Sequence, residues 1–190
     1  MPLTLSKVEV FPWYVFLIYW AISALRIKQT KVTEELGGRL LHVAVMVLAC
    51  YLLFSERLGI GPLSSRFLPK EVYIQDLGVV LTYLGVGLAI WARYSIGQNW
   101  SGRVTLKVDH QLIQSGLYGY MRHPIYTGLL LASAGTALVV GEWRCVAGLL
   151  VAIFELSRKA AKEEALLASE FGSNYQQYRQ RTGFLLPRFR

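Results

Sequence analysis

The sequence predicts an all-α integral membrane protein with about five transmembrane helices. Of the 190 residues, 54% are hydrophobic, and the mean hydropathy is +0.38. This apolar content exceeds what a single soluble core of this length requires. The apolar residues also form separate runs between charged loops, and the Lys and Arg residues lie mostly beside those runs. We therefore expect one membrane domain over residues 1–190.

Three apolar runs occupy the N-terminal half, and we assign them to three membrane helices within residues 1–92. The runs cover residues 11–25, 40–54 and 77–92. Each is near or below the roughly 20 residues that a straight transmembrane helix needs, so flanking residues must complete each crossing. The residues before the first run lack the features of a cleavable signal peptide, so we expect this run to remain as a membrane helix.

Glycines mark the third run, and a short sequence with charged residues interrupts the last one. Gly78, Gly85 and Gly87 indicate a closely packed helix face, because no strand precedes them as a nucleotide-binding loop would require. The long apolar stretch at 128–156 is interrupted by Gly-Glu-Trp-Arg at 141–144. This pattern predicts two helices joined by a tight turn, which brings the expected total to five.

The distribution of basic residues predicts the orientation in the membrane. With the N-terminus outside, the inner segments are 26–39, 93–127 and 157–190, and they hold 15 of the 20 Lys and Arg residues. By the positive-inside rule, the 93–127 connection and the C-terminal tail lie on the cytoplasmic side. The membrane itself, a bacterial inner membrane or the endoplasmic reticulum, stays open.

Charge and cysteine usage argue against several other classes of protein. The net charge of +8 is explained by membrane topology, because the basic residues form no patch interleaved with aromatic residues, and we expect no nucleic-acid partner. Cys50 and Cys145 lie inside apolar runs without a second ligand at suitable spacing. Neither a disulfide framework nor a metal site is expected.

The polar connection at 98–126 is the first candidate for a functional site, because long connections in compact proteins are usually functional. Pro124 suits the first turn of the following helix. Arg122 and His123 would then lie at the helix entrance, where they and the helix-start amides could meet a cofactor carboxylate. The alternative, a snorkelling Arg beside an ordinary helix-entry His, stays open for the pair taken alone.

A second candidate follows the fifth apolar run, where the helix is expected to continue into water as an amphipathic helix. Lys159 and Glu163 are four residues apart and share a face. A solvated charged helix is the alternative. Further on, Tyr175, Tyr178 and the apolar stretch within 182–187 predict a tail that folds back onto the protein.

Three ordered blocks resemble the isoprenylcysteine carboxyl methyltransferase family and its relatives among membrane phospholipid methyltransferases. The first block is His-Gln-Leu-Ile-Gln-Ser-Gly-Leu-Tyr at 110–118, and the second is Arg-His-Pro-Ile-Tyr at 122–126. The third runs from Glu163 to Gly172 and is followed by the two tail tyrosines. The N-terminal runs are similar to the family only in being hydrophobic.

The resemblance implies that S-adenosylmethionine binds without a Rossmann domain. In this family the cofactor pocket lies between the loop before the last helical hairpin and the cytoplasmic tail, which agrees with the lack of a strand–glycine loop–helix pattern. The resemblance carries cofactor contacts to the following residues: His110, Gln111, Leu112, Ile113, Tyr118, Arg122, His123, Pro124, Ile125, Tyr126 and Glu163.

The resemblance also implies the reaction. We expect methylation of the carboxylate of a prenylated cysteine or a similar lipid-like molecule, with S-adenosylhomocysteine as the product. The family places an Arg at the position of Lys159, beside Arg158; a Lys offers a point charge where the Arg offers a fork. A carboxylate acceptor needs no general base, so Lys159 or Arg158 would mainly orient it. For an amine acceptor, Glu163, Glu164 or His123 are candidate bases.

Other functions stay open at this stage. They are a phospholipid N-methyltransferase, a relative of the NADPH-dependent membrane sterol reductases, and a non-catalytic membrane protein that retains the fold. The sequence does not indicate an oligomeric state.

Overall fold

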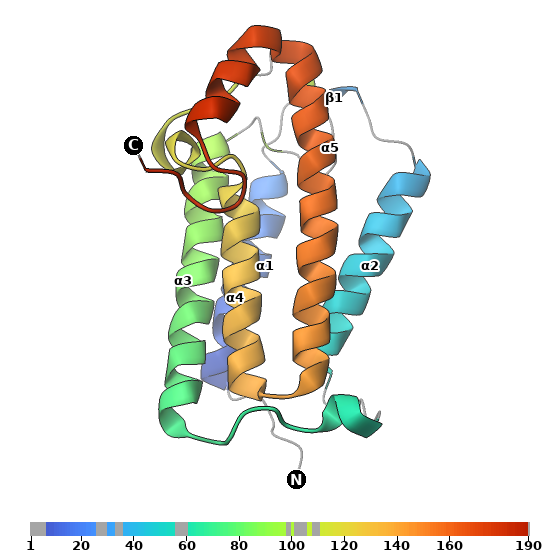
Figure 1. Ribbon diagram of the computed structural model, residues 1–190, viewed down its shortest axis with the longest axis vertical. Coiled ribbons are helices and arrows are strands. Elements are labelled where there is room, and N and C mark those ends of the chain that lie inside the picture. Colours follow the sequence, from blue (N-terminus) through green and yellow to red (C-terminus); the bar gives the residue numbers. More distant parts are fainter. Residues whose placement is uncertain are drawn as a thin grey trace.

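The computed structural model describes residues 7–25, 30–32, 36–55, 61–97, 100, 106–107 and 111–189. Its described part contains five α-helices that run alternately up and down the molecule (Figure 1). They are α1 (Lys7–Ala24), α2 (Leu36–Phe54), α3 (Val72–Ile96), α4 (Pro124–Val140) and α5 (Trp143–Arg181).

Each predicted apolar run coincides with one of these helices, although the first run extends one residue beyond α1, and the break expected at 141–144 lies at residues 141–142, between α4 and α5. Two short strands, β1 (Thr30–Val32) and β2 (Leu106–Lys107), form an antiparallel pair. This pair is a small departure from the purely helical architecture that the sequence predicts. Two 3-10 turns complete the described elements, at Gly61–Ser64 and Gly116–Gly119.

Two of the described helices, α2 and α3, are long and apolar enough to cross a membrane. The apolar part of α1 and the whole of α4 are shorter, so a total of five crossings stays a prediction. Large apolar side chains on α1, α2 and α3 point outward, among them Ile18, Val47 and Leu84. Exposed apolar faces of this kind suit contact with lipid.

Close packing between α3 and α4 positions the start of α4. A Cβ atom at Gly128 would lie 2.6 Å from the backbone nitrogen of Ala89, and one at Gly135 would lie 2.6 Å from that of Thr82. Gly78 and Gly85 meet α4 in the same way, so the predicted packing face is confirmed at these two positions. It is wrong for Gly87, which is exposed and where an added Cβ would have no atom within 4 Å.

The turn between α4 and α5 is closed by an arginine from another segment. Gly141 adopts a left-handed conformation with φ of 67°, and Arg66 packs against it. The Arg66 guanidinium donates to the backbone oxygens of Val140 at 2.6 Å and of Leu68 at 3.1 Å. This arginine therefore holds the hairpin at the end of the bundle opposite the C-terminal tail (Figure 1).

The basic segments gather at one end of the bundle. The end of α3, the start of α4, β1 and the last part of α5 all lie at the same end (Figure 1). This arrangement agrees with the predicted topology, in which the basic segments lie on the same side of the membrane. Which side of the membrane this end faces stays a prediction.

The 39-residue helix α5 continues well beyond the bundle and then reverses direction. Its backbone leaves helical geometry at Gly172, where φ is 51°, a value that glycine adopts without steric cost. The segment after this kink folds back toward the start of α4 (Figure 1). The expected helical continuation beyond the last apolar run and the returning tail are therefore both confirmed.

Candidate active site

The returning tail pairs with the chain that leads into α4. The Arg122 amide donates to the Gly183 oxygen at 2.9 Å, and the Gly183 amide donates to the Tyr120 oxygen at 3.0 Å. The His123 amide donates to the Phe184 oxygen at 3.3 Å. These backbone bonds place residues far apart in the sequence side by side at the polar end of the bundle.

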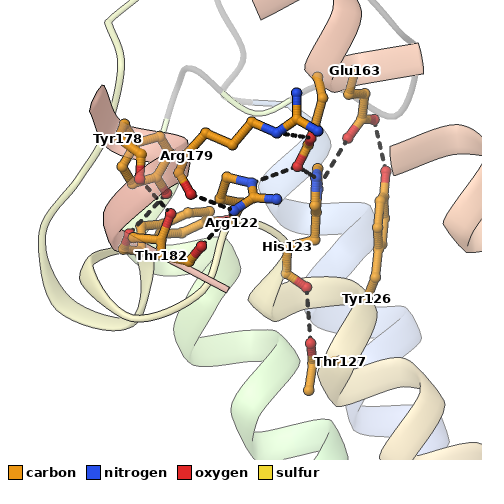
Figure 2. A network of polar contacts seen from close by, with 10 residues as sticks. Arg122, His123, Tyr126, Thr127, Glu163, Tyr178, Arg179 and Thr182 are labelled. Atoms are coloured by element: carbon orange, nitrogen blue, oxygen red, sulfur yellow. Dashed lines mark hydrogen bonds and ion pairs between the residues drawn. The ribbon is translucent and has the colours of Figure 1, made fainter. Parts of the chain in front are cut away.

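Arg122 joins this tail to α5 (Figure 2). Its Nε donates to Glu164 Oε1 at 2.5 Å, and its Nη1 donates to the backbone oxygens of Thr182 at 2.5 Å and Arg179 at 3.2 Å. The guanidinium that was expected to meet a cofactor carboxylate is thus directed to the protein itself. We call the Arg122–Glu164 pair with its tail contacts the clamp.

Glu164 is held ionised by the clamp. Burial by itself raises the pKa of this carboxyl, but the hydrogen bonds from His123 and Arg122 and their charges outweigh burial and lower the pKa to about 2. A carboxylate with so low a pKa is a poor proton acceptor at neutral pH. The geometry therefore favours a structural role for Glu164 over the role of general base.

The low pKa of Glu164 predicts a loss of stability in acid. An unfolded glutamate titrates near about 4.3, and the folded pKa lies below it. The stabilisation is therefore complete above that value and is lost as the pH falls from there toward the folded pKa. Thermal unfolding of the wild type between about pH 6 and 3 should show a steeper fall in Tm than unfolding of Glu164→Gln. Parallel curves would contradict this assignment.

His123, Tyr126 and Glu163 form a second group beside the clamp (Figure 2). The Tyr126 hydroxyl donates to Glu163 Oε1 at 2.7 Å, and the His123 and Tyr126 rings are stacked with centroids 5.6 Å apart. His123 also lies between two carboxylates, with Nδ1 at 3.7 Å from Glu163 and Nε2 at 3.3 Å from Glu164. The three residues that were predicted to converge do face one another.

Lys159 faces the same aromatic side chain from α5. Its Nζ lies 5.9 Å from the centroid of the Tyr126 ring, and the residue is buried. Glu163, one turn along the helix, is 23% exposed at its side chain. The buried ammonium of Lys159 and the more accessible carboxylate of Glu163 thus lie around one tyrosine. We call the following four residues the polar cluster: His123, Tyr126, Lys159 and Glu163.

The other predicted contacts divide into buried and surface positions. Pro124 is the first residue of α4, as expected. Ile125 and Tyr118 belong to a buried apolar group with Ala92, and Ile113 packs against that group. The remaining two described contacts are the half-buried Leu112 and the exposed Gln111. His110 lies outside the described residues.

Arg158 lies away from the polar cluster. Its Nε and Nη2 donate to both carboxylate oxygens of Glu155, at 2.8 and 2.5 Å. His42 on α2 approaches the same carboxylate, with Nδ1 2.7 Å from Oε1. This three-residue contact ties α2 to α5. It was missed from the sequence, although a Glu within an apolar run was a signal that could have suggested a partner.

Two hydroxyl groups secure the loop and the tail, and the sequence singled out Tyr178 but not Thr127. Tyr178 donates from its hydroxyl to the Tyr118 oxygen at 2.8 Å, so the predicted tail tyrosine acts on the loop backbone. Thr127 donates from Oγ1 to the Leu185 oxygen at 2.6 Å. Both bonds join segments about 60 residues apart, and neither could be anticipated before the tail was known to return to this place.

Comparison with known proteins agrees with this arrangement. Residues 78–169 match the model of the Isoprenylcysteine carboxyl methyltransferase (ICMT) family. A protein-S-isoprenylcysteine O-methyltransferase of Schizosaccharomyces pombe is 34% identical over 107 residues, which cover 55% of this chain and 45% of that protein. The corresponding Xenopus laevis protein is 26% identical over 197 residues, covering 98% of this chain and 67% of its own length.

A solved structure shares the fold. It is that of a eukaryotic intramembrane Ras methyltransferase, an isoprenylcysteine carboxyl methyltransferase, with a TM-score of 0.61 and 20% identity over 95% of this chain and 67% of the other. The chain spans about half the length of the first two curated relatives, 45% and 47%. Through residues 78–169, and in agreement with the three blocks that resemble it, the chain is similar to the isoprenylcysteine carboxyl methyltransferase family.

Proposed function

We propose that this protein is a membrane methyltransferase that uses S-adenosylmethionine to esterify the carboxylate of a prenylated cysteine or a similar lipid-like molecule. Similarity to the isoprenylcysteine carboxyl methyltransferase family supports the reaction class. The observation that carries the proposal is the polar cluster, in which Lys159 and Glu163 approach Tyr126 where the helical bundle meets its polar end. The excess of basic residues at this end supports a cytoplasmic position.

The donor chemistry of the polar cluster fits the proposed cofactor. S-adenosylmethionine supplies a methyl carbon bonded to a positively charged sulfur, and its amino-acid end carries an ammonium group. The Glu163 carboxylate can pair with a cation, and the face of the Tyr126 ring can stabilise one. By resemblance to the family, His110 to Ile113, Tyr118 and His123 to Ile125 would complete the binding surface.

The acceptor would be oriented by Lys159. A buried ammonium stabilises a carboxylate that enters beside it, because the low dielectric strengthens their attraction. An ionised carboxylate needs no proton removed, so the protein has chiefly to position the reactants and exclude water.

The proposal is tested by methyl transfer with purified protein in lipid nanodiscs. With labelled cofactor and S-farnesylcysteine analogues, we expect a methyl ester that releases methanol in alkali. Alkali-stable label in phosphatidylethanolamine would instead identify a phospholipid N-methyltransferase. A preparation that binds S-adenosylhomocysteine but forms no ester would contradict the proposed acceptor, and one that binds no cofactor would favour a non-catalytic protein.

Glu163→Gln should weaken S-adenosylhomocysteine binding by about 10- to 100-fold, the cost of losing one charge-assisted contact. Tyr126→Phe keeps the ring but loses the hydrogen bond that positions Glu163, so we expect a loss of about tenfold or less. Isothermal titration calorimetry measures both. Tyr120→Phe is the matched control, since Tyr120 is exposed and lies outside the polar cluster. Equal affinities of Glu163→Gln and the control would contradict the assigned role.

A further inference from the structure

A buried arginine lies near the end of α3, outside the polar cluster. Arg93, in the last turn of α3, is 3% exposed. Its Nη1 donates to the Gly97 oxygen at 2.7 Å and its Nη2 to the Ser23 oxygen at 2.9 Å. The guanidinium carbon lies 4.3 Å from the centroid of the Trp100 ring. This side chain is therefore fixed at the end of the bundle that carries the site.

The bonding of Arg93 is incomplete. A guanidinium has five N–H donors, and within the described part of the chain its buried Nε has no hydrogen-bond partner. No carboxylate pairs with it among the described residues, where its acceptors are backbone oxygens. Carbonyls at a helix end offset part of the cost of a buried cation, but buried arginines are usually paired with an anion. An anionic ligand that accepts a hydrogen bond from Nε would complete the contacts of Arg93.

Tyr118 connects Arg93 to the polar cluster. It is buried in the same apolar group as Ala92, the neighbour of Arg93. Burial raises the pKa of the Tyr118 hydroxyl, the charges of Tyr178 and Glu163 raise it further, and the charge of Arg93 lowers it. One phenol thus lies within electrostatic reach of both the carboxylate of the polar cluster and the buried guanidinium.

The amino-acid end of the proposed cofactor carries an ammonium and a carboxylate on the same carbon. If Glu163 takes the ammonium, a cation nearby would be a suitable partner for the carboxylate. Arg122 is engaged by the clamp, and Lys159 lies over Tyr126, in the place suited to the acceptor. We infer that Arg93 binds the carboxylate of the cofactor's amino-acid end, an assignment that rests on the proposed function.

Binding at Arg93 requires a rearrangement. The Nε atom is shielded from solvent, so the ligand must displace chain that covers it. The Nε edge of the guanidinium can then donate two parallel hydrogen bonds to a carboxylate, a geometry that a lysine cannot reproduce.

The test compares two ligands that differ only in this carboxylate. Calorimetry with the full-length protein would use S-adenosylhomocysteine and its decarboxylated analogue, which keeps the ammonium. Arg93→Gln should weaken S-adenosylhomocysteine binding by about 10- to 100-fold and change binding of the analogue by less than about twofold. Arg93→Lys should recover part of the lost affinity for S-adenosylhomocysteine alone.

Arg66→Gln is the control, because Arg66 also donates to backbone oxygens but at the opposite end of the bundle. It should leave the ratio of the two affinities unchanged. Equal weakening of both ligands by Arg93→Gln would show that Arg93 only supports the fold and would overturn the inference while leaving the proposed function intact. If Arg93→Gln does not fold, Arg93→Lys takes its place. A loss of affinity for S-adenosylhomocysteine but not for the analogue would then support the inference, and an equal loss for both would overturn it. A wild type that binds neither ligand would overturn the proposed function and this inference together.

Discussion

Replacing Glu164 with alanine should remove measurable S-adenosylhomocysteine binding and methyl transfer and lower the thermal stability strongly. The substitution leaves Arg122 buried without its carboxylate, and breaking a buried pair in this way costs about 3–5 kcal/mol. Arg122 also holds the tail through the Thr182 and Arg179 oxygens. Loss of the clamp is therefore expected to release the tail from the start of α4.

Limited proteolysis measures this release. The segment that follows Gly172 should be cleaved faster in the Glu164→Ala protein than in the wild type. Arg179→Ala is the matched control, because its side chain is 57% exposed and lies 3.7 Å from the same carboxylate. This exposed contact is worth about 1 kcal/mol or less, so the control should keep its ligand binding. If the two variants behaved alike, the clamp could not be what holds the tail.

Gly85→Ala should disrupt the packing of α3 against α4, whereas Gly87→Ala should be harmless. A Cβ at position 85 would lie within 3 Å of backbone atoms of Ala132 and Gly128, which cannot move without separating the helices. Such overpacking costs about 1–3 kcal/mol or more. At position 87 no atom lies within 4 Å of the added carbon, and alanine gains up to about 1 kcal/mol in helix propensity.

Thermal unfolding in detergent tests this pair directly. Gly85→Ala should lower the Tm and also reduce cofactor binding, because α4 begins at the polar cluster and would shift with the altered packing. Gly87→Ala should leave the Tm unchanged or slightly higher. Equal Tm values for the two variants would mean that the close approach of α3 and α4 does not limit stability.

The helical framework could be predicted from the sequence because apolar runs of membrane length have few alternatives. The limits of that reasoning show at Gly87. Gly78 and Gly85 are seven residues apart and share a helix face, whereas Gly87 is two residues further on and faces another direction. Which of these two faces meets α4 depends on how α3 is rotated about its axis, and the sequence of α3 alone does not give that rotation.

The polar cluster could be predicted for a different reason. His123, Tyr126 and Glu163 belong to blocks that resemble the family, and their convergence is confirmed by the hydrogen bond and the ring stacking. The different surroundings of Glu163 and Glu164 could not be predicted. Adjacent helical residues point about 100° apart, and the returning tail decides which carboxylate meets Arg122.

Arg158 and Lys159 differ for the same reason. Arg158 turns to Glu155 and His42, whereas Lys159 turns to Tyr126. A basic pair in the sequence indicates positive charge but not which member faces the site. His42 itself gave no signal, because its partner lies 113 residues away and the contact exists only once α2 lies against α5.

The continuity of α5 has a mechanical consequence. From Trp143 to Glu163 the helix is unbroken, a length of about 30 Å. A small change in the tilt of this helix therefore displaces its far end, where Glu163 lies. A change in tilt of about 2° moves the far end by about 1 Å, a displacement large enough to alter a reaction rate. Tilting is one way in which a helix adapts to the thickness of the bilayer, so we expect the composition of the surrounding membrane to influence the geometry at the far end of α5.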